Sequence, residues 1–168
     1  MSKGKDKHEA PIQYLIEKFG PGETLKLEAI YNEEYRSNTN HTCYPLTVDY
    51  VGNSSDCNAY IDVFTAYGCG EWRQLMGKVV ACAYEIQQTK SDREIWMVSA
   101  DLYDKPDCPD YQDYFRRMVQ VARDVLVTEL RSKIHYKDFN PEAQNFETKF
   151  KEIPLDIPKE IREPTQIG

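Results

Sequence analysis

Five separate segments of this 168-residue chain alternate apolar and polar side chains, and this pattern constrains the fold more than any other feature. Apolar residues two apart lie on one face of a β-strand, so each segment predicts a strand with one buried face. Polar or glycine-containing turns separate most of them, which favours a meander of successive strands. The segments are 24–35, 43–51, 57–68, 78–88 and 93–103.

The connection between the third and fourth segments differs from the other turns. Gly68–Gly70 ends the third segment, and about one helical turn is predicted over Glu71–Met76. Gly77 then lets a bent strand leave that turn without a Cβ clash. The order predicted for this stretch is therefore strand, short helix, strand.

Both ends of the chain carry further predicted elements. Apolar spacing of three and four residues predicts a short helix over 10–20, which Gly20–Gly22 ends. The same spacing predicts a long helix from Tyr111 to His135, with Asp110 as its N-cap. The predicted organisation is a flexible arm and short helix (1–22), a β-domain (23–104), a C-terminal interaction helix (105–136) and a proline-containing extended tail (137–168).

Five strands with a short helix between the third and fourth resemble the OB-fold. The segment "LMGKVVACAYEI" is similar to the step that leads from that family's helix into its fourth strand. The resemblance covers residues 23–104 and implies a mainly β (α+β) fold built on a five-stranded antiparallel OB-like barrel. With the added C-terminal helix, the chain resembles the small subunits of replication protein A and related telomere and helicase accessory complexes. The resemblance implies a non-enzymatic accessory subunit in nucleic-acid transactions.

Three aromatic residues are the candidate stacking residues for single-stranded nucleic acid. Tyr60, Phe64 and Trp96 each lie opposite the face of their strand that the pattern predicts to be buried, and bases stack on aromatic rings. Cations on neighbouring elements would contact phosphates, and these are Lys78, Arg73 and Arg93. The alternative is that the aromatic residues fill the core, as aromatic residues of strands commonly do.

The predicted helix over 111–135 carries more apolar residues than one buried stripe requires. The excess predicts a second buried surface, because exposed apolar patches mark interaction sites. That surface would join a protein partner or a second copy in a homo-oligomer. The residues predicted for the interface are Val119, Leu126, Val127 and Leu130.

The net charge of −7 favours a different class of partner. Residues 1–110 hold 11 basic and 18 acidic side chains, whereas residues 111–168 hold ten of each. An acidic body repels phosphates, so nucleic-acid binding would be local and modest. The charge favours an alternative function, an acidic protein-binding factor of the viral or phage inhibitor kind that engages a basic protein.

Residue spacing gives little support to a catalytic or metal site. The five cysteines include no CxxC pair, and His41 and Cys43 have no third ligand beside them. No spacing marks an acid–base pair of carboxylates. No catalytic residue, metal or cofactor is therefore predicted, and an α+β enzyme with an unrecognised site is the third hypothesis.

The chain is expected to have no membrane partner. No apolar run approaches the roughly 20 residues of a membrane helix, and the charged N-terminus lacks the apolar centre of a secretory signal. Two glycosylation tripeptides, at Asn40 and Asn53, favour secretion instead. Widely spaced, odd-numbered cysteines favour reduced thiols, so the expected location is intracellular, cytoplasmic or nuclear.

Overall fold

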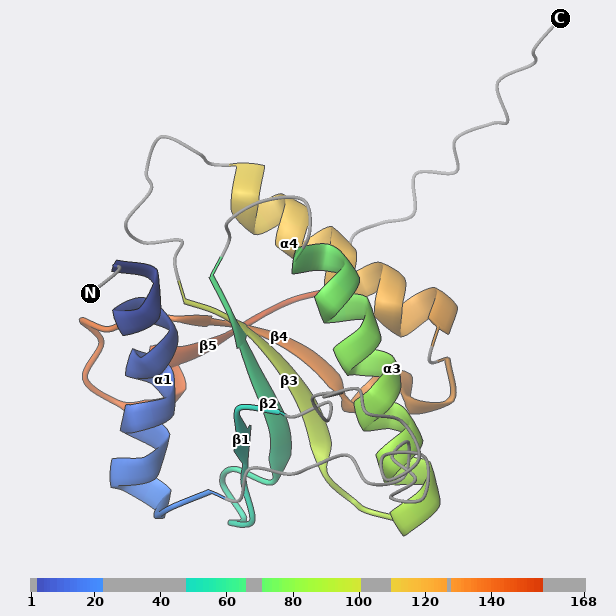
Figure 1. Cartoon of the computed structure of the whole chain (residues 1–168), viewed down its shortest axis with the longest axis horizontal. Coiled ribbons are helices and arrows are strands. Elements are labelled where there is room, and N and C mark those ends of the chain that lie inside the picture. Colours follow the sequence, from blue (N-terminus) through green and yellow to red (C-terminus); the bar gives the residue numbers. More distant parts are fainter. Residues whose placement is uncertain (1–2, 23–47, 66–70, 101–109, 127, 156–168) are drawn as a thin grey trace, which may run out of the picture.

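The computed structural model describes residues 3–22, 48–65, 71–100, 110–126 and 128–155. These residues form one five-stranded mixed sheet with helices on both faces (Figure 1). The spatial order of the strands follows the chain, β1-β2-β3-β4-β5. β1 (Tyr50–Val51) is antiparallel to β2 (Ala59–Phe64), β3 (Glu94–Ser99) and β4 (Ile134–Phe139) run parallel to β2, and β5 (Phe150–Ile153) is antiparallel to β4.

This topology corrects the predicted antiparallel OB-like barrel. The sheet is not closed, because β1 and β5 form its two edges, and its three central strands are parallel. Parallel neighbours need a crossover connection, and both crossovers here contain a helix. α3 (Glu71–Thr89) connects β2 to β3, and α4 (Asp110–Val121) belongs to the connection from β3 to β4. The fold is therefore α+β with an open mixed sheet.

The segment predicted as the fourth strand is the C-terminal part of α3, a helix of 19 residues. A period-two pattern over 78–88 predicts Val80 and Tyr84 on the buried face of a strand, but these side chains are 43% and 41% exposed. The α3 residues that join the core cluster follow helical spacing instead, and they are Leu75, Val79, Cys82, Ala83 and Ile86. Because such spacing places side chains on one face of a helix, this face packs on the sheet.

The long helix predicted over 111–135 is also not present. α4 ends at Val121, a π-helical turn covers Ala122–Leu126, and a 3-10 segment covers Thr128–Lys133. Leu130 has non-helical dihedral angles (φ −108°, ψ 21°), so the helical run is broken before β4 begins at Ile134. The end of the predicted helix and much of the predicted extended tail form β4, the short helix α5 (Phe146–Lys149) and β5.

α1 (Lys3–Phe19) contains the short helix predicted over 10–20 and begins earlier in the chain. It ends at Gly20, whose φ of +94° favours glycine and whose N–H donates to the Ile16 carbonyl at 2.8 Å. The predicted strand at 24–35 lies outside the described residues. Of the strand predicted over 43–51, residues 48–51 are described, and Tyr50–Val51 form β1.

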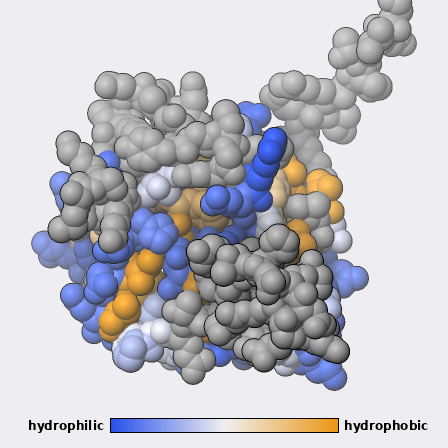
Figure 2. Space-filling model, in the orientation of Figure 1, coloured by the Kyte–Doolittle hydropathy of each residue, from blue (hydrophilic) through white to orange (hydrophobic). Residues whose placement is uncertain are grey.

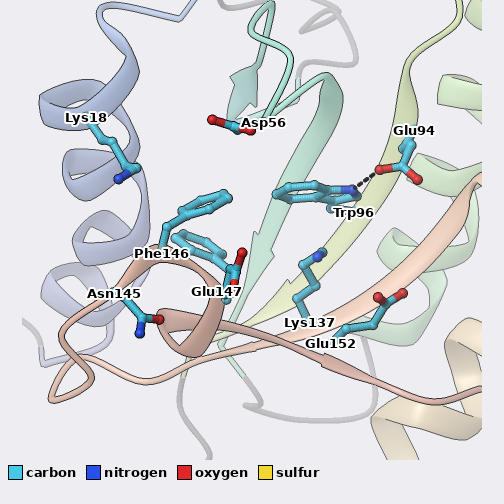
Figure 3. Close-up of a pocket in the computed structure, with 10 residues that line it drawn as sticks. Lys18, Asp56, Glu94, Trp96, Lys137, Asn145, Phe146, Glu147 and Glu152 are labelled. Carbon is cyan, nitrogen blue, oxygen red and sulfur yellow. Dashed lines mark hydrogen bonds between the residues drawn. The ribbon is translucent and has the colours of Figure 1, made fainter.

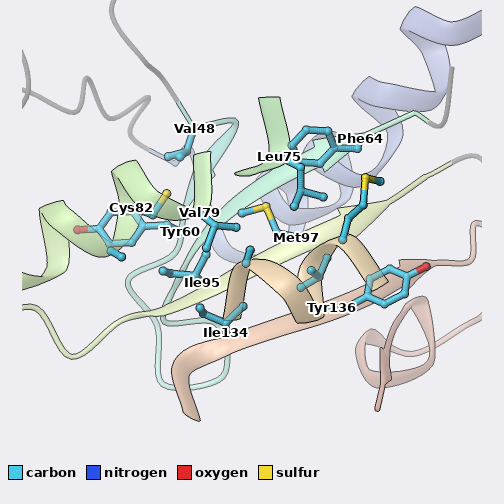
Figure 4. Packing of buried hydrophobic residues seen from close by; sticks show 14 of the residues in the cluster. Val48, Tyr60, Phe64, Leu75, Val79, Cys82, Ile95, Met97, Ile134 and Tyr136 are labelled. Carbon is cyan, nitrogen blue, oxygen red and sulfur yellow. The ribbon is translucent and has the colours of Figure 1, made fainter. Parts of the chain in front are cut away.

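Two hydrophobic clusters, one on each face of the sheet, hold the layers together. Strand residues such as Tyr60, Ile95 and Tyr136 form the cluster under α3 and α4 (Figure 4). The intervening strand residues, such as Ile61 and Trp96, form the second cluster under α1. Successive side chains of a strand point to opposite faces, so β2 is buried along its whole length. Within the described residues, none of the helices is both long and apolar enough to cross a membrane.

Candidate functional site

A pocket of about 730 Å³ lies on the α1 side of the sheet, with aromatic rings in it and charged groups around it (Figure 3). Alternate residues of a strand point to one face, and three strands use this to line the pocket. They contribute Glu94 and Trp96 from β3, Lys137 from β4, and Phe150 and Glu152 from β5. The other lining residues are Lys18, Asp56, Asn145, Phe146 and Glu147.

The helix α5 positions Phe146 beside the strands. Asn145 caps this helix, because its side-chain oxygen accepts a hydrogen bond from the Thr148 N–H at 2.8 Å. The ring centroid of Phe146 lies 6.2 Å from that of Trp96 and 5.4 Å from that of Phe150. These separations are those of favourable aromatic pairs, so the three rings form a continuous apolar wall.

Residues of α1 pack on Phe146 as well. Phe19 contacts Phe146 edge to face, with ring centroids 5.2 Å apart, and Tyr14 stacks on it with an interplanar angle of 8°. Lys18 holds its Nζ 5.7 Å from the centre of the Phe146 ring. The shape of the pocket therefore depends on the position of α1 against the sheet.

Lys137 places its ammonium over the Trp96 indole, with Nζ 4.1 Å from the ring centroid. This separation is well within the range of a cation–π interaction. Burial lowers the pKa of Lys137, whereas the negative charges of Glu152 and Glu94 oppose that change. The indole is held in place by its Nε1–H, which donates to Glu94 Oε1 at 3.1 Å. The face of Trp96 is therefore a binding position for a cation.

Four carboxylates line the pocket, against two ammonium groups. The acidic residues are Asp56, Glu94, Glu147 and Glu152, and the cations are Lys18 and Lys137. An excess of negative charge repels phosphate and attracts cations. Aromatic faces recognise ammonium and guanidinium groups, and carboxylates accept their hydrogen bonds. The pocket therefore suits a cationic group.

The four carboxylates differ in what they already contact. Glu152 hydrogen-bonds to His135 Nδ1, and Glu94 Oε2 lies 2.6 Å from His135 Nε2, an ion-pair contact without hydrogen-bond geometry. Asp56 and Glu147 are exposed, and neither makes a hydrogen bond or an ion pair within the part of the chain that the structure describes. These two carboxylates can therefore accept hydrogen bonds from a ligand.

The structure does not bring together the three aromatic residues predicted to stack on bases. Tyr60 and Phe64 are 2% and 5% exposed and belong to the cluster under α3 and α4. Trp96 lies on the opposite face of the sheet and lines the pocket. By burial, the alternative that aromatic residues fill the core describes all three, because Trp96 is 4% exposed, but Trp96 also lines the pocket beneath the Lys137 ammonium.

The three predicted phosphate contacts lie outside the pocket lining. Arg73 is exposed on α3, and Lys78 Nζ lies 3.6 Å from Asp62 Oδ1. Arg93 Nε donates to the Gly52 carbonyl at 3.2 Å, and its guanidinium carbon lies 5.5 Å from the centre of the Tyr60 ring. These cations do not form one surface with Trp96.

The residues predicted for an oligomer interface are divided between the core and undescribed positions. Val119 is fully buried, and Leu130 is half-buried against the same cluster. The side chains of Leu126 and Val127 lie outside the described residues. The exposed apolar residues of this region are instead Tyr114, Val121 and Val125.

A second polar cluster joins α1, α3 and the β1–β2 edge. Asp49 Oδ2 accepts from the Val63 N–H at 2.8 Å and lies 3.2 Å from His8 Nε2. Burial, together with the negative charge of Asp49, raises the pKa of Asp62 to about 8. Against its own burial, hydrogen bonds from His8 and Val63 hold the pKa of Asp49 below its usual range. Such divergent carboxyl groups are found in acid–base catalysts, but this pair does not line the pocket.

A third polar cluster lies on β3, β4 and α4. Ser99 and Asp138 are paired in register, and the Asp138 carboxylate accepts hydrogen bonds from Ser99, Tyr136 and Gln112. Asp138 is 1% exposed, and both of its oxygens have donors. A buried carboxylate with its hydrogen bonds satisfied fixes the strands against α4 and offers no open position to a substrate.

The sequence does not predict the pocket, because four of its lining residues lie in the predicted extended tail, namely Lys137, Phe146, Phe150 and Glu152. The alternation in 134–139 is a strand signal, and Asn145 before the turn Phe146–Lys149 is a helix-start signal. Neither signal shows that these residues meet Glu94 and Trp96, because strand pairing alone brings them together.

The described residues contain no group of three or more His, Cys, Asp or Glu side chains that could hold a metal ion. No protein-family model, curated protein or solved structure matches this chain.

Proposed function

We propose that this chain is a non-enzymatic binding protein that engages a basic segment of a partner protein, and that the pocket takes up one cationic side chain of that segment. The observation that carries the proposal is the Lys137 ammonium 4.1 Å over the Trp96 indole, inside a pocket rimmed by carboxylates. It supports the proposal because the chain itself supplies the geometry in which a cation binds an aromatic ring.

The charge of the whole chain supports the same class of partner. The net charge is −7, and residues 1–110 carry all of the acidic excess. On the one face that Figure 2 shows, most of the described surface is hydrophilic. A negative surface attracts a basic segment over several ångströms and speeds its encounter, and the pocket then provides specific contacts.

Nucleic-acid binding, the first expectation from the sequence, has weaker support. The carboxylates around Trp96 repel phosphates, and the two other candidate stacking residues are in the core. Oligonucleotides therefore serve as the competing ligands in the test of the proposal.

Isothermal titration calorimetry with a synthetic peptide of alternating basic and glycine residues tests the proposal. The control peptide replaces each basic residue with Glu. We expect the basic peptide to bind and the acidic peptide not to bind, and we expect the affinity to fall as salt is added. Binding of oligo(dT) or oligo(rU), without binding of the basic peptide, would contradict the proposal and favour a nucleic-acid function.

Two double variants separate the pocket from the general negative charge. Asp56→Asn with Glu147→Gln removes the two carboxylates that contact no described residue, and should weaken peptide binding about fivefold. Glu17→Gln with Glu142→Gln removes two exposed carboxylates outside the pocket lining and should change affinity much less. Equal losses in the two variants would mean that the peptide binds the surface rather than the pocket.

A further inference from the structure

Lys137 already occupies the face of Trp96 that a ligand cation would use. Its Nζ lies 4.1 Å from the ring centroid, and it comes from the neighbouring strand β4. A second cation cannot stack on the same side of the ring at the same time, because the ring face is covered and the like charges repel. A ligand cation must therefore move Lys137 before it can reach the indole.

Glu152 offers Lys137 another position. The two residues are partners in the antiparallel register of β4 and β5. Directly opposite side chains in such a pair have Cβ atoms about 4.5–5.5 Å apart, so an ion pair needs only side-chain rotation. No ion pair joins these two described residues, because the Lys137 ammonium lies over Trp96 and Glu152 bonds to His135. That hydrogen bond uses one carboxylate oxygen of Glu152. The other oxygen can accept a hydrogen bond from the Lys137 ammonium.

We propose that Lys137 is an internal occupant of the pocket, and that a partner's ammonium or guanidinium group binds by displacing it from Trp96 towards Glu152. This inference rests on the proposed function. It adds that the ligand cation contacts the Trp96 ring face and competes with Lys137 for it. Lys137 then limits the affinity of the pocket and rejects neutral side chains, which cannot replace the lost cation–π contact.

Three single variants test the competition by calorimetry with the basic peptide. Lys137→Met keeps much of the apolar stem and vacates the indole face, so binding should tighten roughly tenfold. Lys137→Arg keeps a cation on the ring and should change affinity little. Lys18→Met removes the same charge from the pocket lining without vacating Trp96, and should tighten binding about twofold, which measures the plain effect of charge.

An NMR measurement on the wild-type chain tests the displacement without relying on a variant. The Trp96 ring current should shift the Hε protons of Lys137 upfield in the free protein, and saturation with the basic peptide should return them towards ordinary lysine values. If the peptide binds while this shift persists, and if Lys137→Met tightens binding no more than Lys18→Met, the inference is overturned and the proposed function stands. If neither the wild type nor Lys137→Met binds the peptide, both are overturned.

Discussion

Asp49 and Asp62 face each other across β1 and β2, one position beyond the register pair of Tyr50 and Ile61. Burial and the negative charge of Asp49 together raise the pKa of Asp62, whereas contacts with His8 and the Val63 N–H lower that of Asp49. Two adjacent carboxyl groups cannot both ionise without strong repulsion, so the pair retains one proton, which Asp62 holds. His8 of α1 and Lys78 of α3 contact opposite ends of this pair, so its protonation affects how both helices meet the sheet.

Asp62 should make the folded state less stable as the pH rises. Its pKa is raised from 3.8 to about 8, so the folded chain holds a proton that the unfolded chain releases. The free energy of unfolding therefore falls as the pH rises from the unfolded pKa through the folded pKa, and the loss is complete above the folded pKa. Asp62→Asn should gain stability relative to wild type between about pH 5 and about pH 8 in urea denaturation. A difference that stays constant over this range would contradict the assignment.

His8 should contribute stability at low pH. The hydrogen bond and the charge of Asp49 raise the pKa of His8 above 6.5, so the contribution is fully present below 6.5 and is lost as the pH rises through the higher folded value. The His8 side chain is 37% exposed, so solvent screens the pair. We expect His8→Gln to cost about 0.5 kcal/mol at about pH 5.5 and almost nothing at about pH 9, by urea denaturation. An equal cost at both values would mean that His8 stabilises by packing.

The Tyr136 hydroxyl should stabilise the buried Asp138 carboxylate. Tyr136→Phe removes one of the donors to that carboxylate and should lower the free energy of unfolding by about 1–3 kcal/mol in urea denaturation. Tyr84→Phe removes a hydroxyl from a side chain that is 41% exposed and should have almost no effect. Similar small effects of the two variants would show that Asp138 does not need this donor.

Neighbouring valines of α3 should respond in opposite ways to truncation. Val79 is fully buried, and Val79→Ala should cost roughly 2–3 kcal/mol through lost burial and the cavity left behind. Val80→Ala, one residue along, should cost almost nothing, because this side chain points away from the sheet. Thermal unfolding of the two variants measures the difference. A larger loss of stability for Val80→Ala than for Val79→Ala would contradict the helix and favour the strand predicted over 78–88.

The sequence predicts helix or strand correctly for segments whose apolar residues fit only one of the two periods. β2 and β3 lie inside predicted strands, and α1 ends at the predicted glycine. The segment 78–88 was misassigned because Cys82 and Ile86 fit both a period of two and a helical period. A helix buries Val79 and exposes Val80, whereas the predicted strand would bury Val80. Only packing against the sheet decides between the two arrangements. The barrel followed from that one misassigned segment.

The candidate site was less accessible to sequence analysis than the fold. Trp96 was singled out as a binding residue, but its contacts with Lys137 and Phe146 join residues about 40 or 50 positions apart in the chain. Parallel pairing of β3 with β4 creates these contacts, and no local pattern specifies which strands pair. The excess of acidic residues is visible in the sequence, and the proposal of a basic partner rests on it together with the pocket.

The indole N–H signal of Trp96 reports directly on cation binding in the pocket. In the Trp72→Phe variant it is the one remaining tryptophan indole signal, and it reports on the hydrogen bond from Nε1 to Glu94 in the pocket. A two-dimensional ¹H–¹⁵N spectrum recorded during titration with the basic peptide should show this signal moving to saturation, while the acidic control peptide and oligo(dT) leave it unchanged. An indole signal that stays in place while the peptide binds elsewhere, or that moves with the oligonucleotide instead, would contradict a cation-binding pocket.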